Sequence, residues 1–267
     1  MIADIDTQYP TKDPSEDKHL PLISIITVVY NGVRTIEQTI QSVINQPYPN
    51  KEYIIIDGGS QDGTVDIIRN FSSHLTYWIS ERDNGIYDAM NKGIRHAKGE
   101  LIGIINADDW YEMNIFNSIA SQYLSTGSDH VIYGMLRIFQ EDEFYSMVGN
   151  SVRVLLEDTI MHPTCFIPMK FYRTLGTYNS AYKYSADYDL ILRYVNNGVK
   201  FSFIEKPIAN FRRGGISATP KAETEKYKVR VRHRLISKTE YILRIILIQA
   251  GSFLRKTNEA KRSLNSK

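Results

Sequence analysis

The sequence predicts an α/β protein with a mostly parallel central sheet flanked by helices. Three apolar runs rich in β-branched residues, 22–30, 51–57 and 101–105, lack the polar alternation of a half-exposed strand. Such continuous runs are typical of parallel strands that are buried on both faces. Segments with apolar residues at helical spacing lie between them, so strand and helix alternate over the first hundred or so residues. This order predicts an open sheet with right-handed crossovers, in which ligands bind beyond the carboxyl ends of the strands.

The individual elements follow from local signals along the chain. Pro47 stops the first helix, and Gly99 ends the third as a left-handed cap would. The expected helices cover 35–46, 64–70, 88–97, 115–123 and 186–195. The further expected strands or extended segments cover 77–80, 130–140, 143–148, 161–168 and 199–204. The periodicity is weaker after Tyr111, so the elements of the second half are less sharply defined.

Composition limits the class of protein. The 267 residues are 42% hydrophobic, which is enough for one full domain with a sizeable core. The net charge of +2 gives no reason to expect a nucleic-acid partner, and a lone Cys165 excludes an internal disulfide and CxxC metal spacing. The acidic N-terminal segment lacks the apolar stretch of a signal peptide, and no uncharged apolar run is long enough to predict a spanning helix. We therefore expect a cytoplasmic protein.

Charge divides the chain into three parts. Residues 1–20 form a polar lead-in, 21–220 the α/β domain and 221–267 a basic helical tail. The tail holds 13 Lys or Arg against 4 Asp or Glu, and cations flank its apolar stretch over 241–248. A basic amphipathic helix of this kind lies in a membrane interface and attracts anionic lipids, which predicts a peripheral protein on the inner face of the cytoplasmic membrane. The alternative is that the tail packs on the body or on a second subunit in a homodimer.

An acidic cluster, Asn106-Ala107-Asp108-Asp109, follows directly on the third apolar run. Paired carboxylates at a strand end hold a hard divalent cation such as Mn²⁺ or Mg²⁺, and phosphate oxygens complete its shell. The alternative is that the two aspartates cap a helix that begins near Met113, because aspartate is a favoured N-cap. The pair alone does not decide between the two interpretations.

A second polar cluster, with the sequence DGGSQDGT over 57–64, follows the second run. Its glycines let the backbone turn tightly beside a ligand, and Asp57 at the strand end accepts hydrogen bonds from a base or a ribose hydroxyl. The alternative is an ordinary turn followed by a helix cap, which is the more frequent meaning of such a sequence in isolation. Together with Asn31-Gly32 after the first run, all three clusters lie at strand ends on one edge of the sheet. They would therefore form one site.

The order of these motifs closely resembles that of the family 2 glycosyltransferases. A strand ending in Tyr30-Asn31, the DGGSQDGT turn and the strand ending in NADD stand at the spacing of that family, and the likeness covers about 22–219. The segment DNGIYDAMNKG over 83–93 is similar to one typical of a bacterial branch. The resemblance implies the nucleotide-binding GT-A fold and inverting transfer from a nucleotide sugar, with UDP as the commonest nucleotide of the family. It also implies a nucleotide-binding half, 21–110, and an acceptor half, 111–220.

Carried over residue by residue, the resemblance implies a donor site. Its donor-binding residues are Tyr30, Asn31, Asp57, Asp83, Asn91, Asn106, Ala107, Asp108, Arg212 and Arg213. The first three would cradle the nucleoside, and the next two would lie beside it.

The diphosphate end of the donor site falls on the acidic cluster and on a later basic loop. Asp108 takes the metal position of the family's Asp-x-Asp motif, with Asp109 as a second ligand. The sequence departs from the family at Asn106, which lacks the charge of the usual aspartate but still accepts a bond from a ribose hydroxyl or a metal-bound water. The later segment FRRGGIS is similar to the loop that closes over the diphosphate, so Arg212 and Arg213 would contact phosphate oxygens. The alternative is a flexible basic loop.

An inverting transfer needs a general base beside the acceptor hydroxyl, because the sugar is attacked opposite the departing diphosphate without an enzyme nucleophile. The segment SADYDLILR over 185–193 resembles the family's Glu-Asp-x-Asp-Leu, with Ala186 in place of the glutamate, and it assigns the base to Asp187. The alternative role of Asp187 is a cap at the helix start. Asp189 points elsewhere on that helix and would support the site without catalysing.

The acceptor side is less sharply defined. Trp110, His162 and Ala186 would line the acceptor or sugar pocket, although a lone histidine is as often a structural residue. The acceptor implied by the resemblance is a growing lipid-linked glycan of a bacterial surface polysaccharide. Two alternatives are a nucleotidyltransferase and a non-catalytic nucleotide-sugar-binding module. The former would need a glycine- and lysine-rich phosphate loop, which the turn after Tyr30 lacks.

Overall fold

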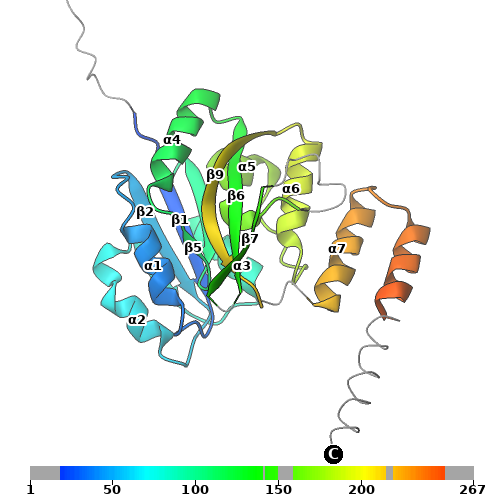
Figure 1. Ribbon diagram of the computed structural model, residues 1–267, viewed down its shortest axis with the longest axis horizontal. Helices are drawn as coiled ribbons and strands as arrows, with labels where there is room; N and C mark the ends of the chain where they lie inside the picture. The colour runs from blue at the N-terminus through cyan, green and yellow to red at the C-terminus, as the bar shows by residue number, and fades with distance from the viewer. Residues whose placement is uncertain (1–18, 141, 150–158, 215–218, 250–267) are drawn as a thin grey trace, which may run out of the picture.

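The computed structural model describes residues 19–140, 142–149, 159–214 and 219–249. These residues form a mixed nine-stranded sheet with helices on both faces (Figure 1). Hydrogen-bonded neighbours follow the order β3-β2-β1-β4-β8-β6-β9-β5, and β7 pairs with β6. The strands are β1 (Ile23–Val29), β2 (Lys51–Asp57), β3 (Tyr77–Ser80), β4 (Leu101–Asn106), β5 (Trp110–Tyr111), β6 (His130–Gln140), β7 (Glu143–Val148), β8 (Phe166–Pro168) and β9 (Lys200–Arg212). The helices are α1 (Ile36–Ile44), α2 (Thr64–Asn70), α3 (Ile86–His96), α4 (Ile115–Thr126), α5 (Met169–Leu175), α6 (Ala186–Asn196) and α7 (Pro220–Arg232), with two short 3₁₀ segments, η1 (Ser72–His74) and η3 (His162–Thr164).

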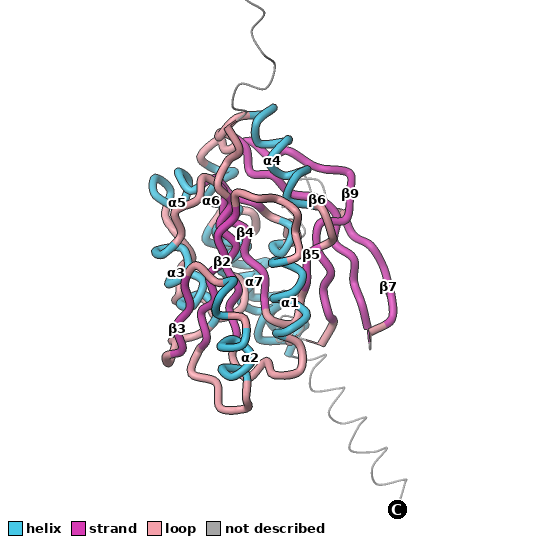
Figure 2. The backbone as a smooth tube through the Cα atoms, turned by 90° about the vertical axis from the view of Figure 1, so that its left-hand side faces the viewer, coloured by secondary structure: helices cyan, strands magenta, loops and turns pink. Residues whose placement is uncertain are grey.

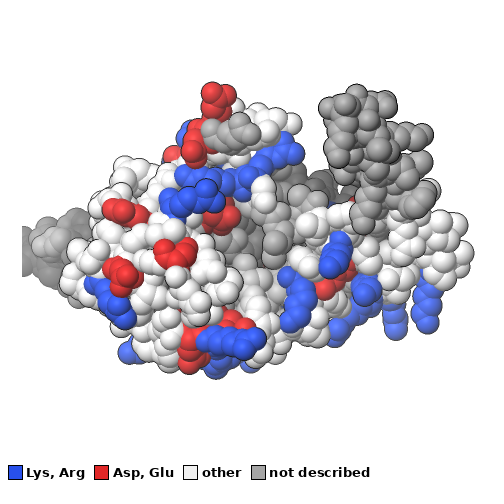
Figure 3. Space-filling view, turned by 90° about the horizontal axis from the view of Figure 1, so that it is seen from below, with Lys and Arg blue, Asp and Glu red and all other residues white. Residues whose placement is uncertain are grey.

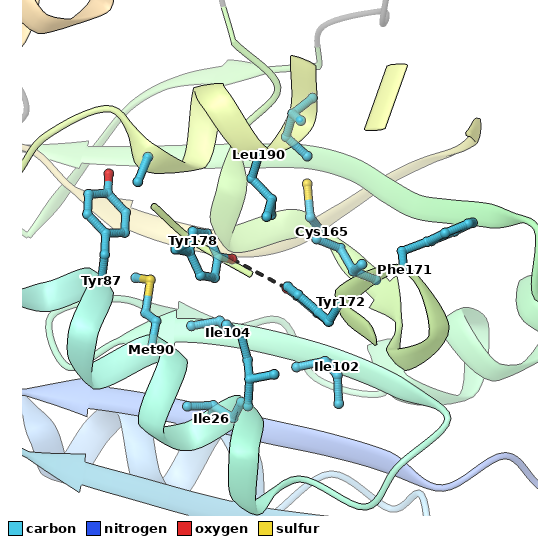
Figure 4. Packing of buried hydrophobic residues seen from close by; sticks show 14 of the residues in the cluster. Ile26, Tyr87, Met90, Ile102, Ile104, Cys165, Phe171, Tyr172, Tyr178 and Leu190 are labelled. Carbon is cyan, nitrogen blue, oxygen red and sulfur yellow. Dashed lines mark hydrogen bonds between the residues drawn. The ribbon is translucent and has the colours of Figure 1, made fainter. Parts of the chain in front are cut away.

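The centre of the sheet is parallel and fully covered. β1 pairs in parallel with β2 and β4, and β2 pairs in parallel with β3. Successive residues of a strand point to opposite faces, so Ile54 and Ile104 pack in one core while Ile55 and Ile105 pack in the other. The first core lies between the sheet, α3 and α6 (Figure 4). Because both faces of β1, β2 and β4 are buried, most residues of these three strands are apolar, and the predicted α/β fold class is confirmed.

Beyond β4 the sheet becomes mixed. β8 runs antiparallel to both β4 and β6, whereas β9 runs parallel to β6 and antiparallel to β5. The β6–β7 hairpin and β9 stand on the side of the sheet away from β3 (Figure 2). Helix α5 follows β8 directly and was not predicted, and the extended segment expected over 161–168 divides into η3 and β8.

The prediction that the last strand, expected over 199–204, ends at Ile204 is wrong, because β9 continues to Arg212. Glu205 and Lys206 interrupt the apolar pattern, but the pairing with β6 continues beyond them. The two residues form a bulge, and the pairing resumes where Pro207 lies opposite Met135. The longer strand carries the chain across the sheet to β5.

The C-terminal part of the described chain is helical, as predicted. Helix α7 lies alongside α6 and buries Ala222 and Val229 (Figure 1). A second helix covers 238–249. Within the described ranges, none of the helices combines the length and the apolar content that crossing a bilayer requires. The first 18 residues of the predicted lead-in lie outside the described ranges.

Candidate active site

A cavity of about 1150 Å³ lies at the carboxyl ends of β1, β2 and β4. Its wall includes residues from all three polar clusters that follow these strands, among them Asn31, Gly58 and Asp108. The wall also includes the loop before α6 and the first turn of that helix, through Tyr184 and Asp187. The three clusters therefore share one cavity, and the second half of the chain contributes part of its wall.

Hydrogen bonds join the loops that follow β1 and β2. Asn31 has a left-handed backbone conformation with a φ of 52°, which asparagine tolerates better than most residues. Its backbone N–H donates to Ser60 Oγ at 2.7 Å, and its side-chain Oδ1 accepts from the Gln61 N–H at 3.0 Å. Tyr30 beside it is 69% exposed at the cavity wall. An exposed ring held on a braced loop suits stacking against a flat ligand.

The carboxylate of Asp57 faces its own turn and does not line the cavity. Asp57 is fully buried, and its Oδ2 accepts from the N–H of Gly59 at 3.1 Å and of Ser60 at 2.9 Å. Ser80 Oγ donates to the same oxygen at 2.6 Å, and Ser60 Oγ donates to Oδ1. The turn interpretation therefore describes this side chain, and Gly58 takes its place at the cavity wall.

Asp83 and Asn91 were both expected beside the nucleoside, but only Asp83 lines the cavity. Lys92 Nζ lies 2.5 Å from Asp83 Oδ1, yet burial raises the pKa of the Asp83 carboxyl against the effect of this ion pair. A Cβ at Gly58 would lie 3.0 Å from Asp83 Oδ2, so glycine lets the two segments approach. Asn91 donates to Tyr178 O at 2.8 Å and accepts from Tyr178 N–H at 3.0 Å, which makes it a tie between α3 and the loop after α5.

The acidic cluster divides between the cavity and the protein interior. Asp108 lines the cavity, where burial raises the pKa of its carboxyl against the charge of Arg212. Asp109 is fully buried, and its Oδ1 accepts the Arg212 backbone N–H at 3.2 Å. Burial and then the charge of Asp108 raise the pKa of Asp109 well above its usual range. Asp109 therefore braces β9 through Oδ1 and does not line the cavity, while its buried Oδ2 has no hydrogen-bond partner among the described residues. Its role as a second metal ligand stays a prediction.

Asp187 lies in the first turn of α6, in the part of the wall that the second half of the chain forms. The Tyr87 hydroxyl donates to Asp187 Oδ1 at 3.0 Å. Burial and the charge of Asp187 raise the pKa of Tyr87 well above its usual range, so the phenol keeps its proton and remains a donor. Ala186 is fully buried and does not line the cavity as expected, because its side chain packs in the core beneath α6. Asp189 lies away from the cavity, as the helical spacing predicts.

His162 lines the cavity and is also bonded to buried tyrosines. Its Nε2 lies 2.5 Å from Tyr178 Oη, which in turn lies 3.4 Å from Tyr172 Oη (Figure 4). Burial lowers the pKa of the imidazole, although the charge of Asp187 opposes this. His162 is therefore neutral at neutral pH, and it combines a structural bond with a position at the cavity wall.

The strand-end motifs and Asp187 lie in a stretch, residues 24–191, that matches the profile of Glycosyl transferase family 2. The match covers more than half of the chain. The chain is a family 2 glycosyltransferase. As an enzyme of this glycosyltransferase family, it is neither a nucleotidyltransferase nor a non-catalytic binding module.

Relatives and solved structures agree with the family. An uncharacterised glycosyltransferase of Mycobacterium tuberculosis is 32% identical over 180 residues, which cover 65% of this chain and 68% of the relative. A PGL/p-HBAD biosynthesis glycosyltransferase of Mycobacterium bovis is 27% identical over 205 residues, covering 74% of this chain and 80% of that protein. The fold is similar to S. aureus TarS 1-349 in complex with UDP-GlcNAc, with a TM-score of 0.66 and 17% identity over 82% of this chain and 69% of that chain. The mannosyltransferase PcManGT from Pyrobaculum calidifontis, in complex with GDP-Man and Mn²⁺, gives a TM-score of 0.62 and 17% identity over 87% of this chain and 70% of that chain. The GT-A fold of this glycosyltransferase is thereby confirmed.

The surroundings of Asp108 fit a divalent cation only if the donor supplies further ligands. Among the described residues, no three His, Cys, Asp or Glu side chains gather into a group that could hold a metal ion. Asn106 and Ala107 also line the cavity, and the buried Oδ1 of Asn106 has no hydrogen-bond partner in the described part of the chain. A buried acceptor of this kind suits a hydroxyl or a metal-bound water. Of the two aspartates, only Asp108 lines the cavity, which makes phosphate oxygens necessary for the rest of the shell.

Arg212 and Arg213, both expected on donor phosphates, contact other protein groups. The Arg212 guanidinium donates to Asp108 O at 2.8 Å and lies over Trp110, 4.6 Å from the ring centroid. Arg213 lies over Tyr145 at 4.5 Å. Neither arginine lines the cavity, and Trp110, which was expected there, is covered by Arg212. Arg212 therefore braces the acidic cluster, and the end of the predicted FRRGGIS loop lies outside the described residues.

Tyr87, Lys183 and Tyr184 are among the residues of the cavity wall that were not predicted. Tyr87 belongs to the DNGIYDAMNKG segment that carried the family resemblance, so the sequence marked its position but not its role. Lys183 Nζ donates to Asn84 O at 2.9 Å and joins the two halves of the wall. No periodicity marks 183–184, because their place depends on tertiary packing in front of α6.

Proposed function

We propose that this glycosyltransferase moves a sugar from a UDP-sugar to an acceptor hydroxyl, with inversion at the anomeric carbon. In this mechanism Asp187 is the general base, and Asp108 holds the donor diphosphate through Mn²⁺ or Mg²⁺. The observation that carries the proposal is the shared cavity: Asp108, just after β4, and Asp187, at the start of α6, both belong to its wall.

The nucleoside is assigned to the loops after β1 and β2. Tyr30 offers an exposed ring for stacking, and Gly58 lets the ligand approach the backbone closely. Asp83 offers a carboxylate that accepts from a base N–H or a ribose hydroxyl. Two solved proteins with a similar fold, TarS with UDP-GlcNAc and PcManGT with GDP-Man, support a nucleotide sugar as the donor. Asp57 and Asn91 act indirectly, by holding the loops that form the wall.

The diphosphate is assigned to the acidic cluster. A divalent cation, when bound at Asp108, supplies positive charge that stabilises the departing diphosphate. The Mn²⁺ of PcManGT supports this assignment. Arg212 holds the Asp108 main chain at 2.8 Å and so sets the direction from which the carboxylate meets the donor. Asn106 Oδ1 accepts a hydrogen bond from a hydroxyl or a bound water beside it.

The transfer is one displacement. The acceptor oxygen attacks the anomeric carbon while the bond from that carbon to the diphosphate breaks, and the diphosphate leaves with the electron pair. Asp187 takes the proton of the acceptor hydroxyl. Tyr87 fixes Asp187 Oδ1 by a 3.0 Å hydrogen bond, which leaves Oδ2 for the acceptor. Attack opposite the leaving group inverts the configuration, and the neutral His162 imidazole bonds a sugar hydroxyl.

The acceptor is proposed to be a lipid-linked glycan, reached from the cytoplasmic face of the membrane. Four neighbouring side chains of the helix over 238–249 are 55–65% exposed, namely those of Ile242, Leu243, Ile246 and Leu247. Exposed Lys and Arg side chains of α7 and the following helix gather on the same end of the molecule (Figure 3). An apolar stripe among cations suits insertion between anionic lipids.

A screen of nucleotide sugars tests the central part of the proposal. We expect UDP-sugars to raise the melting temperature of the purified protein in the presence of Mn²⁺ and to release UDP when a hydroxyl acceptor is supplied. Asp187→Asn should keep the shift and lose the release. The proposal fails if no nucleotide sugar gives either signal, or if the variant transfers at the wild-type rate.

Flotation with lipid vesicles tests the membrane proposal separately. The wild type should float with vesicles of phosphatidylglycerol and remain behind with vesicles of phosphatidylcholine. The double variant Leu243→Glu and Leu247→Glu should lose flotation, whereas Leu124→Glu, at an exposed leucine on α4, should keep it. Equal flotation of all three proteins would rule out this helix as the membrane contact.

A further inference from the structure

We infer that Glu225 of α7 is a positioning residue that sets the catalytic base from outside the cavity. The inference rests on the proposed role of Asp187. Glu225 does not line the cavity, but its carboxylate accepts three consecutive backbone N–H groups, from Lys183 at 2.9 Å, Tyr184 at 2.5 Å and Ser185 at 2.9 Å. Hydrogen bonds to an ionised acceptor are the stronger kind, and three of them on one carboxylate fix the path of the main chain.

The three N–H groups lie immediately before Ala186, the first residue of α6. Ser185 is the N-cap residue, and its side chain makes no capping hydrogen bond. A negative charge at a helix N-terminus is stabilising, and here the charge comes from a different helix. Asp187 follows two residues later, so the position of its carboxylate depends on the chain segment that Glu225 holds.

The same contacts determine the cavity wall. Lys183 and Tyr184 line the cavity together with Asp187, and two of these three residues donate their backbone N–H to Glu225. One carboxylate outside the cavity therefore holds the segment from which the base and its two neighbours project. The donor loops after β1, β2 and β4 make no hydrogen bond with Glu225 among the described residues.

Helix α7 is itself fixed against α6 at its other end. His233, at the C-cap of α7, donates from Nε2 to the buried Asp189 carboxylate at 2.9 Å, and Arg193 reaches the other oxygen of Asp189 at 3.1 Å. Between the two ends, Val229 is fully buried against the core. Glu225 is thus presented by a helix that is anchored beyond it. We call the three hydrogen bonds from Glu225 to 183–185 the clamp. The whole of α7 lies past residue 191, where the family match ends, so the carboxylate of the clamp comes from outside the matched region.

The clamp predicts a separation between donor binding and turnover. Without the Glu225 charge, the start of α6 should lose its fixed path, and Asp187 should spend less time at the acceptor. Misplacement of a catalytic group by about 1 Å costs on the order of 100-fold in rate. Donor affinity should not change, because the donor loops are braced among themselves.

The test compares Glu225→Gln and Glu225→Asp with Glu223→Gln, a matched change at an exposed glutamate on the same helix. We expect Glu225→Gln to lower kcat by about 10- to 100-fold with an unchanged KM for the donor. Glu225→Asp should recover part of the loss, and Glu223→Gln should match the wild type. An unchanged kcat in Glu225→Gln would overturn the inference, as would an equal change of kcat and donor KM.

Amide hydrogen exchange on the same proteins gives a readout that does not depend on activity. Glu225→Gln should speed exchange at 183–185 and leave the β1 and β4 amides protected, whereas unchanged protection at 183–185 would contradict the clamp. Asp187→Asn, assayed in parallel, reports on the base itself. If it remains active, the proposed function is wrong; if it is inactive while Glu225→Gln is fully active, only the clamp is wrong.

Discussion

The two walls of the cavity are held in place by different means. The donor wall follows the ends of β1, β2 and β4, whose backbones are fixed by parallel pairing in the centre of the sheet. The acceptor wall consists of the loop before α6 and its first turn, and side chains from two other helices hold it, Tyr87 from α3 and Glu225 from α7. A substitution in the donor wall therefore changes a ligand contact on a rigid frame. A substitution behind the acceptor wall displaces the main chain that carries Asp187. We therefore expect donor binding and transfer to fail separately.

The largest effect is expected for Asp187→Asn. The amide keeps the shape of the carboxylate but cannot take the acceptor proton, and loss of a general base costs about 10²- to 10⁴-fold in rate. Steady-state kinetics should show this loss in kcat, with donor affinity unchanged. Asp66→Asn, at an exposed aspartate on α2, serves as the control and should behave as the wild type. Retention of more than a tenth of the wild-type kcat in Asp187→Asn would argue against the base.

The next effect distinguishes the two aspartates of the acidic cluster. Asp108→Asn should weaken Mn²⁺-dependent binding of the nucleotide sugar by about 10- to 100-fold, because the charged ligand is lost. Asp109→Asn should stay close to the wild type, because Asp109 lies outside the cavity and an amide keeps the oxygen that accepts the Arg212 backbone N–H. Titration calorimetry of the nucleotide sugar into each variant, with Mn²⁺ and again after chelation by EDTA, measures both affinities. A stronger loss in Asp109→Asn than in Asp108→Asn would reverse the assignment.

A smaller effect is expected behind the acceptor wall for Tyr87→Phe. The change removes one hydrogen bond to the Asp187 carboxylate, which corresponds to about 1–2 kcal/mol and about a 5- to 30-fold lower kcat. Donor KM should not change, since the phenyl ring remains in the core. Tyr145→Phe removes a hydroxyl from a tyrosine that is 59% exposed and should leave kcat unchanged. Equal kcat values for the two variants would show that Tyr87 does not orient the base.

The smallest effect concerns pH and stability at His162. Burial lowers its pKa below the usual value of 6.5, so below that pH the unfolded chain binds a proton that the folded chain does not. The stability contributed by the neutral imidazole is therefore present above pH 6.5 and is lost as the pH falls toward the folded-state pKa. The free energy of unfolding should fall more steeply below pH 6.5 in the wild type than in His162→Asn. His74→Asn, at an exposed histidine, should follow the wild type. The lowered pKa would be disproved by parallel curves for wild type and His162→Asn.

The contrast between the walls also explains how much of the fold and the site could be predicted from the sequence. The donor half was predictable because a strand buried on both faces is apolar at most positions, so β1, β2 and β4 stand out from their composition. The strand ends then place Asn31, Gly58 and Asp108 at one edge without further information.

The details of the site depend on contacts that no local pattern encodes. The Asp57 carboxylate accepts hydrogen bonds within its own turn. The Arg212 guanidinium donates to Asp108 O and lies over the ring of Trp110, although both residue types suit a ligand equally well. The family resemblance gives a position in the chain but not the direction of a side chain. Glu225 lies 40 to 42 positions beyond the N–H groups it accepts, so only the packing of α7 on α6 reveals it.

The measurement that bears most directly on the two-wall mechanism determines donor affinity and transfer rate for Asp108→Asn and Asp187→Asn beside the wild type, with one donor and Mn²⁺. We predict that Asp187→Asn binds the nucleotide sugar as the wild type does and does not transfer it, whereas Asp108→Asn binds it weakly. Transfer by Asp187→Asn at the wild-type rate, or equal loss of donor affinity in both variants, would contradict the division of labour between the two carboxylates.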